Sequence, residues 1–344
     1  MVILVLIITH RLHHTSSSLV KVVCKLLDLQ QQRIKFLVHF VLKSKENILS
    51  EQAYLDLLQE LVSKAETRGF REVRDGHKRC SLFGRQLRFN LEEGFPLMTH
   101  KKVFVRGAFE ELMWMLRGQT DVQTLEEKKV FIWSLWKDVL VEYGYQEGDL
   151  GAIYGESWRN FGEISDRVIG TDEVAEEDIY GGDQEGFDQI EWVINEIKTN
   201  PSSSRLIVSA WNPHVHCVEG KAALPPCHTL FQFFVEDSKL SCQLYQRSGD
   251  YIIGNPLNII FYAMLTHIMA QQCNLGVGDF IITFGDVHLY SDQIEMAKEI
   301  LTRPTYPFPQ IEIEKAKDLY SYEWEDVKVL NYVSGDKISI PVAK

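Results

Sequence analysis

The stretch Ala223-Leu-Pro-Pro-Cys-His-Thr-Leu-Phe-Gln-Phe-Phe234 predicts a cysteine presented at the start of a strand. Each of its two prolines has a fixed φ angle and lacks a backbone N–H, so the turn before Cys227 is stiff. A stiff turn holds the thiol in one position, as a nucleophile requires. The mainly apolar runs 230–235 and 240–245 flank the polar residues 236–239. This pattern predicts two strands joined by a turn.

Charged residues near this cysteine suggest how it is activated. A thiol attacks as the thiolate, and a nearby cation lowers its pKa, so Arg247 is the expected activator. Arg247 and Asp250 are expected just beyond the second strand. Neighbouring residues on a strand point to opposite faces, so His228 is not expected to take the proton of Cys227. A cysteine hydrolase would therefore need a histidine from elsewhere.

Composition indicates a globular protein without nucleic-acid or metal chemistry. The 344 residues are 45% hydrophobic and 24% charged, with a net charge of −12. A chain this acidic lacks the basic face that general nucleic-acid binding requires. Its six cysteines are scattered without a CxxC pair, which favours a reducing, cytoplasmic setting over a disulfide framework. The group His214, His216 and Cys217 lacks a second ligand set, so we expect no metal.

Residues 1–45 differ from the remainder of the chain. They carry seven basic residues and one acidic residue, a net charge of 7 − 1 = +6, which leaves −12 − 6 = −18 for residues 46–344. The apolar run 2–8 is too short to span a bilayer. We expect a basic extension outside the folded domain, and an appended leader, a transit peptide and an amphipathic arm all remain open.

The pattern over residues 46–344 predicts one α+β domain with a mixed β-sheet and flanking helices. The expected helices cover residues 50–64, 109–116, 188–199 and 258–272, and further strands cover residues 81–89, 206–211 and 280–284. We expect the run 206–211 to be a buried strand. The acidic, glycine-containing segments 138–150 and 163–187 are expected to be surface insertions.

Several side chains outside the cysteine motif suggest a polar site. Glu111 lies in a mainly apolar helix, and a buried carboxylate has a raised pKa unless it is paired. Trp133 and Trp136 are three residues apart, so we expect their indoles on one helical face. Arginines suit the recognition of a phosphate monoester through forked donors. The candidates are Arg74, Arg205 and Arg247.

Five motifs in a fixed order resemble the thymidylate synthase family. They are Pro225-Pro-Cys-His228, Cys242-Gln-Leu-Tyr-Gln-Arg-Ser-Gly-Asp250, Gly254-Asn-Pro-Leu-Asn258, Asp286-Val-His-Leu-Tyr290 and the terminal Pro341-Val-Ala-Lys344. The similarity extends from about Tyr54 to the last residue. It implies a catalytic domain over residues 46–344 and a homodimer formed through the sheet, in which each active site uses Arg205 of the other subunit. A cytoplasmic location follows, or the host cytoplasm if the chain is viral.

The resemblance assigns chemical roles to five residues. Cys227 is similar to the nucleophile that adds to C6 of dUMP, with Arg247 beside it. Glu111 resembles the carboxylate that organises water and proton transfers, and Tyr154 the tyrosine that assists removal of the C5 proton. Asn258 resembles the amide that reads the uracil edge. The co-substrate would be 5,10-methylenetetrahydrofolate, and the products dTMP and dihydrofolate.

The resemblance also implies two sets of binding residues. The nucleotide-binding set is Arg74, Arg205, Gln246, Arg247, Ser248, Gly249, Asp250, Asn258, His288 and Tyr290. The folate-binding set is Lys101, Phe104, Trp133, Trp136, Asp250, Gly254 and Ala343. Within this set, Lys101 resembles a contact of the polyglutamate tail.

The chain departs from the family pattern on the phosphate side of the site. Two adjacent arginines are usual where this chain has Ser204 and Arg205, so one phosphate donor is absent. The loop after Arg74 also differs, and Lys78 and Arg79 are the candidates to compensate.

Further departures lie on the folate side of the site. Phe104 replaces a common histidine, Ser134 an aspartate, and Lys344 an apolar last residue. A dUMP hydroxymethylase, or less readily a dCMP hydroxymethylase, is therefore an alternative to a synthase. A catalytically impaired binding or regulatory homologue is a third possibility.

Overall fold

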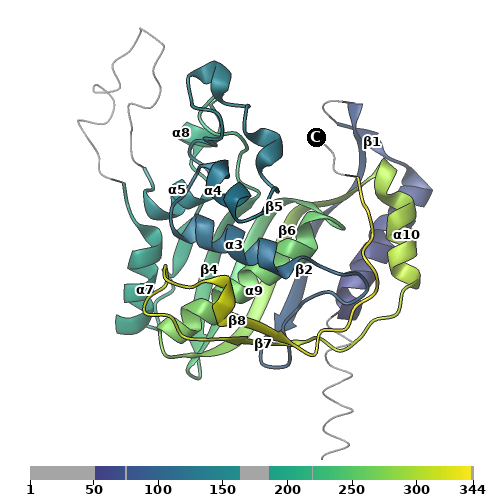
Figure 1. Ribbon diagram of the computed structural model, residues 1–344. Helices are drawn as coiled ribbons and strands as arrows, with labels where there is room; N and C mark the ends of the chain where they lie inside the picture. Colours follow the sequence, from purple (N-terminus) through teal and green to yellow (C-terminus); the bar gives the residue numbers. More distant parts are fainter. Residues whose placement is uncertain (1–50, 74–75, 163–185, 219, 342–344) are drawn as a thin grey trace, which may run out of the picture. The chain divides into compact units, whose positions relative to one another are not determined.

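The computed structural model describes residues 51–73, 76–162, 186–218 and 220–341 (Figure 1). The chain divides into two units, residues 1–47 and 48–344, and every described residue belongs to the second unit. The basic extension predicted over residues 1–45 and most of the predicted insertion 163–187 lie outside the described residues.

A six-stranded mixed sheet forms the centre of the second unit, as predicted. Its order is β1-β2-β6-β5-β4-β3, and only the β5–β6 pair is parallel. The strands are β1 (Arg71–Glu72), β2 (Lys78–Asn90), β3 (Ile207–Ser209), β4 (His228–Glu236), β5 (Lys239–Asp250) and β6 (Gly276–Tyr290).

The turn between β4 and β5 explains why the two strands pair. Glu236 pairs with Lys239, and the two residues between them, Asp237 and Ser238, have φ angles of 50° and 58°. Two consecutive left-handed residues match the twist of a two-residue hairpin. The predicted turn over residues 236–239 is therefore confirmed, and it fixes the register as far as Leu230 opposite Tyr245. A register shift between Leu230 and His228 then brings His228 opposite Gln246.

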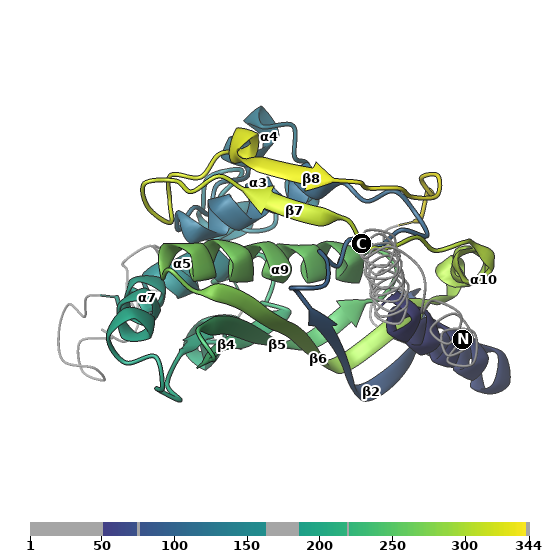
Figure 2. The ribbon, with the colours of Figure 1, turned by 90° about the horizontal axis from the view of Figure 1, so that it is seen from below.

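Helix α9 (Gly254–Gln272) connects the parallel strands β5 and β6. A parallel pair needs such a crossover because the chain must return to the same end of the sheet. The helix is buried on almost all sides, since it packs on β5 and β6 and against α3 (Val105–Leu116). Figure 2 shows α9 and α3 stacked on one face of the sheet, with the pair β7 (Gln310–Ile313) and β8 (Val327–Leu330) beyond them.

Shorter elements surround this central layer. A helix covers residues 51–68, slightly longer than the predicted 50–64. The others are α4 (Val122–Glu127), η2 (Ser134–Trp136), η3 (Val141–Tyr143), α5 (Tyr154–Arg159), α7 (Gln189–Thr199), α8 (Pro213–His216), η4 (Ser291–Gln293), α10 (Ile294–Thr302) and η5 (Trp324–Asp326). Helix α7 begins where predicted, because the Asp188 side chain accepts from the Glu191 N–H and caps it.

Two strand predictions were too short. Arg247 and Asp250 lie inside β5 and not beyond it, and β6 is much longer than the predicted 280–284. Glycines in β6 allow this strand to pack closely against β5. A Cβ on Gly278 would lie 2.4 Å from the Ser241 Oγ, and one on Gly285 would lie 2.9 Å from the Arg247 carbonyl oxygen. The strands approach closely there because no side chain intervenes.

Two other sequence predictions need correction. The run 206–211 contains only the three-residue strand β3, which lies at the sheet edge and leaves Ile207 exposed, so it is not a fully buried strand. The segment 138–150 is mainly exposed, as a surface insertion should be, but Leu140 and Leu150 are buried and anchor it to the core.

No helix among the residues 51–73, 76–162, 186–218 and 220–341 is both long enough and apolar enough to cross a membrane.

The aromatic core beneath β4 gives a test of the fold. Phe231 is 1% exposed and packs on the rings of Trp158, Phe233 and Tyr262. We expect Phe231→Ala to lower the free energy of unfolding by ~3–5 kcal/mol, because it removes a buried ring and leaves a cavity. Urea denaturation monitored by circular dichroism measures this change. Phe131→Ala is the control, because Phe131 is 59% exposed. Equal losses in both variants would contradict the described packing.

Candidate active site

The turn that carries Cys227 is fixed by Arg247. The Arg247 Nε donates to the Pro226 carbonyl at 2.9 Å, and its Nη2 donates to the Pro225 carbonyl at 2.7 Å. The Arg247 backbone N–H also donates to the Cys227 carbonyl at 2.9 Å. The guanidinium lies over the Trp211 ring at 5.4 Å. The predicted stiff turn is therefore tied to β5 by three hydrogen bonds.

The Cys227 thiol lies between a cation and a phenol. The thiol is free and half-buried. Burial raises its pKa, whereas the charge of Arg247 and a hydrogen bond with the Tyr154 side chain lower it, and burial has the larger effect. The Tyr154 hydroxyl also accepts a hydrogen bond from the Cys227 backbone N–H at 2.8 Å. The expected activator and the expected tyrosine thus both act directly on this residue.

His228 is next to the nucleophile in sequence but is too weakly basic to hold a proton at neutral pH. It is 6% exposed, and burial lowers its pKa to about 4 despite a side-chain hydrogen bond with Asn258. Its ring packs among Tyr154, Phe261 and Tyr262. The structure therefore supports the prediction that His228 does not serve Cys227.

A buried amide cluster lies at the base of the site. The Gln246 Nε2 donates to the side-chain oxygen of Asn258 at 3.1 Å and to that of Asn255 at 3.2 Å. A Cβ on Gly249 would lie 2.7 Å from the Asn255 Oδ1, so this position requires glycine. Asn255 lies within the motif that ends in Asn258, but no role was predicted for it from the sequence.

Some buried polar atoms of this region lack a partner in the described part of the chain. They are the Gln246 Oε1, the Asn255 Nδ2 and the His228 Nδ1. Buried polar atoms are nearly always hydrogen-bonded, so atoms of this kind suit a polar ligand.

Glu111 is a buried carboxylate bonded to an indole. Its Oε1 accepts from the Trp133 Nε1 at 2.8 Å. Burial raises the pKa of Glu111 to about 7, although this hydrogen bond lowers it. The predicted burial of Glu111 is confirmed, and its carboxyl can exchange a proton near neutral pH.

The two indoles expected on the folate side lie together. The Trp133 and Trp136 ring centroids are 5.7 Å apart, and the Trp133 ring is 6.0 Å from that of Tyr154. Trp133 is buried and Trp136 is half-buried. Trp136 therefore retains an exposed part that a ligand could contact.

Asp250 is a second perturbed carboxylate. Burial raises its pKa, while hydrogen bonds and the nearby His288 lower it. Its oxygens accept from the Gln293 Nε2 at 2.8 Å and from the Ile253 N–H at 3.2 Å. Lys101 is buried nearby, donates to the Ile252 carbonyl and has a pKa lowered by burial to about 8. The ammonium of Lys101 is therefore not an exposed cation, so its role towards a polyglutamate tail stays a prediction.

His288 is oriented by Asp286, a residue for which no role was predicted from the sequence. Its Nδ1 lies 3.2 Å from the Asp286 Oδ1, and the ring is 5.1 Å from that of half-buried Tyr290. Arg71 and Arg79 both donate to Asp286, at 3.2 and 2.9 Å. Residues two apart on a strand share a face, which was the available signal. Arg79, a candidate phosphate ligand, is thus bonded to a carboxylate.

The remaining predicted site residues lie in different elements of the fold. Arg205 is exposed, and its flanking residues contact Gln232 and Phe233 of β4, roughly 17 Å along the strand from Cys227. Ser248 is half-buried in β5. Gly254 begins α9.

Phe104 is 57% exposed beside the start of α3. Arg74, Ala343 and Lys344 lie outside the described residues.

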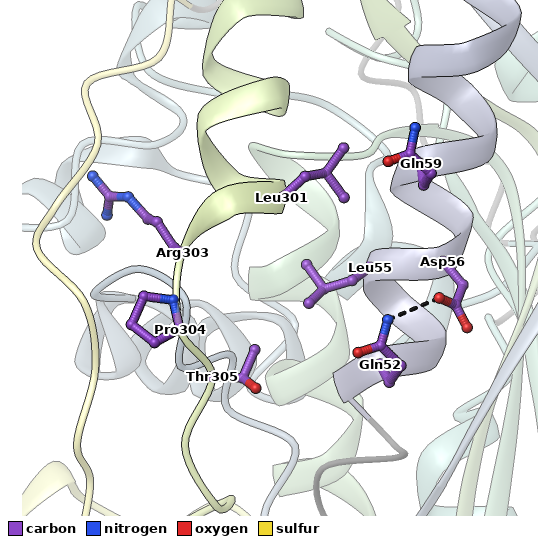
Figure 3. A pocket seen from close by; sticks show the side chains of 8 residues that line it. All are labelled: Gln52, Leu55, Asp56, Gln59, Leu301, Arg303, Pro304 and Thr305. Atoms are coloured by element: carbon purple, nitrogen blue, oxygen red, sulfur yellow. Dashed lines mark hydrogen bonds between the residues drawn. The ribbon is translucent and has the colours of Figure 1, made fainter.

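A cleft elsewhere in the domain contains none of the candidate site residues. Its volume is about 370 Å³, and it lies between the helix over residues 51–68 and the end of α10 (Figure 3). Its lining residues are Gln52, Leu55, Asp56, Gln59, Leu301, Arg303, Pro304 and Thr305. It contains no residue of either predicted binding set, so we place the candidate site at Cys227.

The contact between Glu111 and Trp133 yields a testable consequence. In Trp133→Phe we expect the pKa of Glu111 to rise above about 7, because the only effect that lowers it is lost. Infrared difference spectra against Glu111→Gln follow the protonated carboxyl group as a function of pH. Trp136→Phe makes the same change without removing a bond to Glu111, so its pKa should match the unsubstituted protein. An unchanged pKa in Trp133→Phe would contradict the assignment.

One comparison with known proteins identifies a relationship. A family model described as thymidylate synthase matches residues 52–344.

Proposed function

The chain belongs to the thymidylate synthase family, and we therefore propose that it methylates dUMP to dTMP with 5,10-methylenetetrahydrofolate as co-substrate, giving dihydrofolate. Enzymes of this family are methyltransferases that use this folate and are typically dimeric. The observation that carries the proposal is the Cys227 thiol held between Arg247 and Tyr154.

The first step follows from the environment of the thiol. The Cys227 sulfur forms a bond to C6 of the uracil ring, and the electron pair of the C5–C6 double bond moves towards C5 and O4. Because burial keeps the free thiol protonated at neutral pH, the proton must leave as the nucleotide binds. The positive charge of Arg247 favours the thiolate, and two of its five donors already hold the Pro225 and Pro226 carbonyls. Its remaining donors are available for the nucleotide phosphate.

Recognition of uracil is assigned to the amide cluster. Asn258 has both a donor and an acceptor, which suit O4 and N3–H of uracil, whereas an aspartate would suit cytosine better. Gln246 bonds the Asn258 oxygen and fixes the orientation of the amide. The buried atoms without partners in this cluster support a polar ligand here. We therefore favour dUMP over dCMP.

Two groups are placed to move protons. Glu111, with a pKa of about 7, can hold or release a proton at neutral pH, so we assign it the water and proton transfers. The Tyr154 hydroxyl is adjacent to Cys227 and is assigned to assist removal of the C5 proton, accepting that proton as it passes its own to a water molecule. Burial raises the pKa of Tyr154 well above its usual value, so it acts through its neutral hydroxyl.

The residues on the folate side fit an amphiphilic aromatic co-substrate. Trp133 and Trp136 offer an indole surface, and Asp250 offers a carboxylate that can accept from ring N–H groups. When bound, methylenetetrahydrofolate supplies the one-carbon unit and the hydride that reduces it. Phe104 and Ser134 depart from the family pattern on this side, which is why a hydroxymethylase is the second candidate.

A homodimer through the sheet is the assembly that we propose. On the sheet face opposite α9, Ile207, Phe234 and Tyr245 are exposed, with exposed fractions from 36% to 57%. Exposed apolar side chains gathered on one face are typical of an interaction surface. Arg205 is too far from Cys227 along β4 to reach its own site, so we assign it to the site of the partner subunit.

The reaction itself is tested with purified protein, dUMP and methylenetetrahydrofolate. We expect dihydrofolate and dTMP in equal amounts, measured by absorbance and by mass. Cys227→Ala should remove turnover, because no other nucleophile adjoins Tyr154 in the described part of the chain. 5-Hydroxymethyl-dUMP formed together with tetrahydrofolate would instead identify the hydroxymethylase.

Mixed dimers test the assignment of Arg205. Cys227→Ala and Arg205→Ala should each be nearly inactive alone. After equal mixing and subunit exchange, half of the dimers contain one intact site, so activity should recover to about a quarter of the unsubstituted enzyme. Mixing Cys227→Ala with Glu111→Gln is the control. Each of these changes disables the site of its own subunit, so a mixed dimer has no intact site and activity should not recover. A mixture containing Arg205→Ala that stays inactive would contradict donation across the interface.

A further inference from the structure

One buried amide joins three segments around the candidate site. Gln293, at the end of η4, is 0% exposed. Its Nε2 donates to the Asp250 Oδ2 at 2.8 Å and to the Pro341 carbonyl at 3.4 Å. Its Oε1 accepts from the Tyr290 N–H at 3.2 Å. The amide thus contacts the end of β5, the end of β6 and the C-terminal segment.

The contact with Asp250 matters because that carboxylate is buried among other ionisable groups. His288 faces it from β6, Lys101 from the segment before α3, and Tyr54 from the helix over residues 51–68. Gln293 donates to Asp250 at 2.8 Å, a shorter distance than the 3.2 Å of the Ile253 N–H, and the Ile252 backbone also bonds this carboxylate. A neutral donor fixes one carboxylate oxygen without adding charge to this group.

We propose that Gln293 is a positioning residue that holds the Asp250 carboxylate for the folate and links it to the C-terminal segment at Pro341. This inference rests on the proposed function, in which Asp250 contacts the folate. Without the amide, Asp250 would keep its bond to Ile253 but could turn its second oxygen away. Gln293 contacts neither Cys227 nor Asn258, and it bonds Tyr290 only at the backbone N–H and not at the ring assigned to the nucleotide, so we expect the larger effect on the folate.

A purely structural role would give a different result. Gln293 also bonds Tyr290, so its loss lowers stability whatever its role. Gln271 allows a matched comparison, because its amide also joins two segments, through the Ile313 carbonyl at 2.8 Å and the Tyr322 hydroxyl at 2.6 Å, and neither partner belongs to the candidate site. A general loss of stability should change the kinetic constants of the Gln293 and Gln271 variants in the same way.

The experiment measures kcat and KM for dUMP and for methylenetetrahydrofolate in Gln293→Met and Gln271→Met. We expect Gln293→Met to raise KM for the folate about tenfold, the typical effect of losing a hydrogen bond to a charged group, with KM for dUMP within about twofold. Gln271→Met should change neither KM. Equal changes in the two KM values, or an unchanged KM for the folate, would overturn the proposal.

Gln293→Glu provides a second test with the same side-chain length. It places a carboxylate against Asp250, and two adjacent carboxylates share one proton at low pH and repel when both are ionised. KM for the folate should therefore rise between pH 6 and pH 9 more steeply than in the unsubstituted enzyme, while KM for dUMP should not. Parallel pH profiles would overturn the proposal, and this variant decides the question should Gln293→Met fail to fold.

Turnover of dUMP by the unsubstituted enzyme distinguishes a failure of the proposed function from a failure of the role of Gln293. If this enzyme does not turn over dUMP, the proposed function fails. Equilibrium dialysis of the folate in the presence of dUMP then compares Gln293→Met with Gln271→Met directly. Weaker folate binding in Gln293→Met alone supports the positioning role of Gln293. Equal binding in both variants contradicts it.

Discussion

The bonds from the Arg247 guanidinium to the Pro225 and Pro226 carbonyls connect the cysteine turn to the central strand β5. Prolines lack a backbone N–H, so the carbonyl is the only backbone hydrogen-bonding group that Pro225 and Pro226 each offer. One side chain therefore fixes the position of the thiol and brings a positive charge to it. A lysine could not do both, because it lacks the planar fork that reaches two carbonyls at once. The other groups of the candidate site are arranged around this fixed turn.

Burial affects the carboxylates of the site differently according to their partners. Burial raises the pKa of Glu111 to about 7, because its one neutral donor offsets the effect only in part. Asp250 also has neutral donors at its oxygens, and burial raises its pKa. Burial likewise raises the pKa of Asp286, but hydrogen bonding to His288 and the charges of His288 and Arg79 outweigh it and leave the pKa lowered. Glu111 can thus carry a proton near neutrality, whereas Asp286 stays ionised and orients an imidazole.

Local patterns predicted the mixed sheet, the β4–β5 turn and the burial of Glu111. They failed where a residue's role depends on a distant strand. The strand predicted over residues 280–284 was too short, and just beyond its two ends Gly278 and Gly285 allow close approach to β5, a strand about 40 residues earlier. Asn255 and Gln293 received no role, because a polar residue becomes significant only when the fold buries it beside another polar group. The family resemblance named most site residues, but their partners required coordinates.

The pairing of β2 with β6 constrains how the protein is made. Arg79 pairs with Tyr290, so the centre of the sheet joins segments about 200 residues apart. Contacts of such long sequence separation form slowly, because a large loop must close first. During synthesis the hairpin of β4 and β5 leaves the ribosome before β6 and exposes the edge of β5 until its neighbour arrives. Until then the edge is open to pairing with another chain, and molecular chaperones are well suited to protect it.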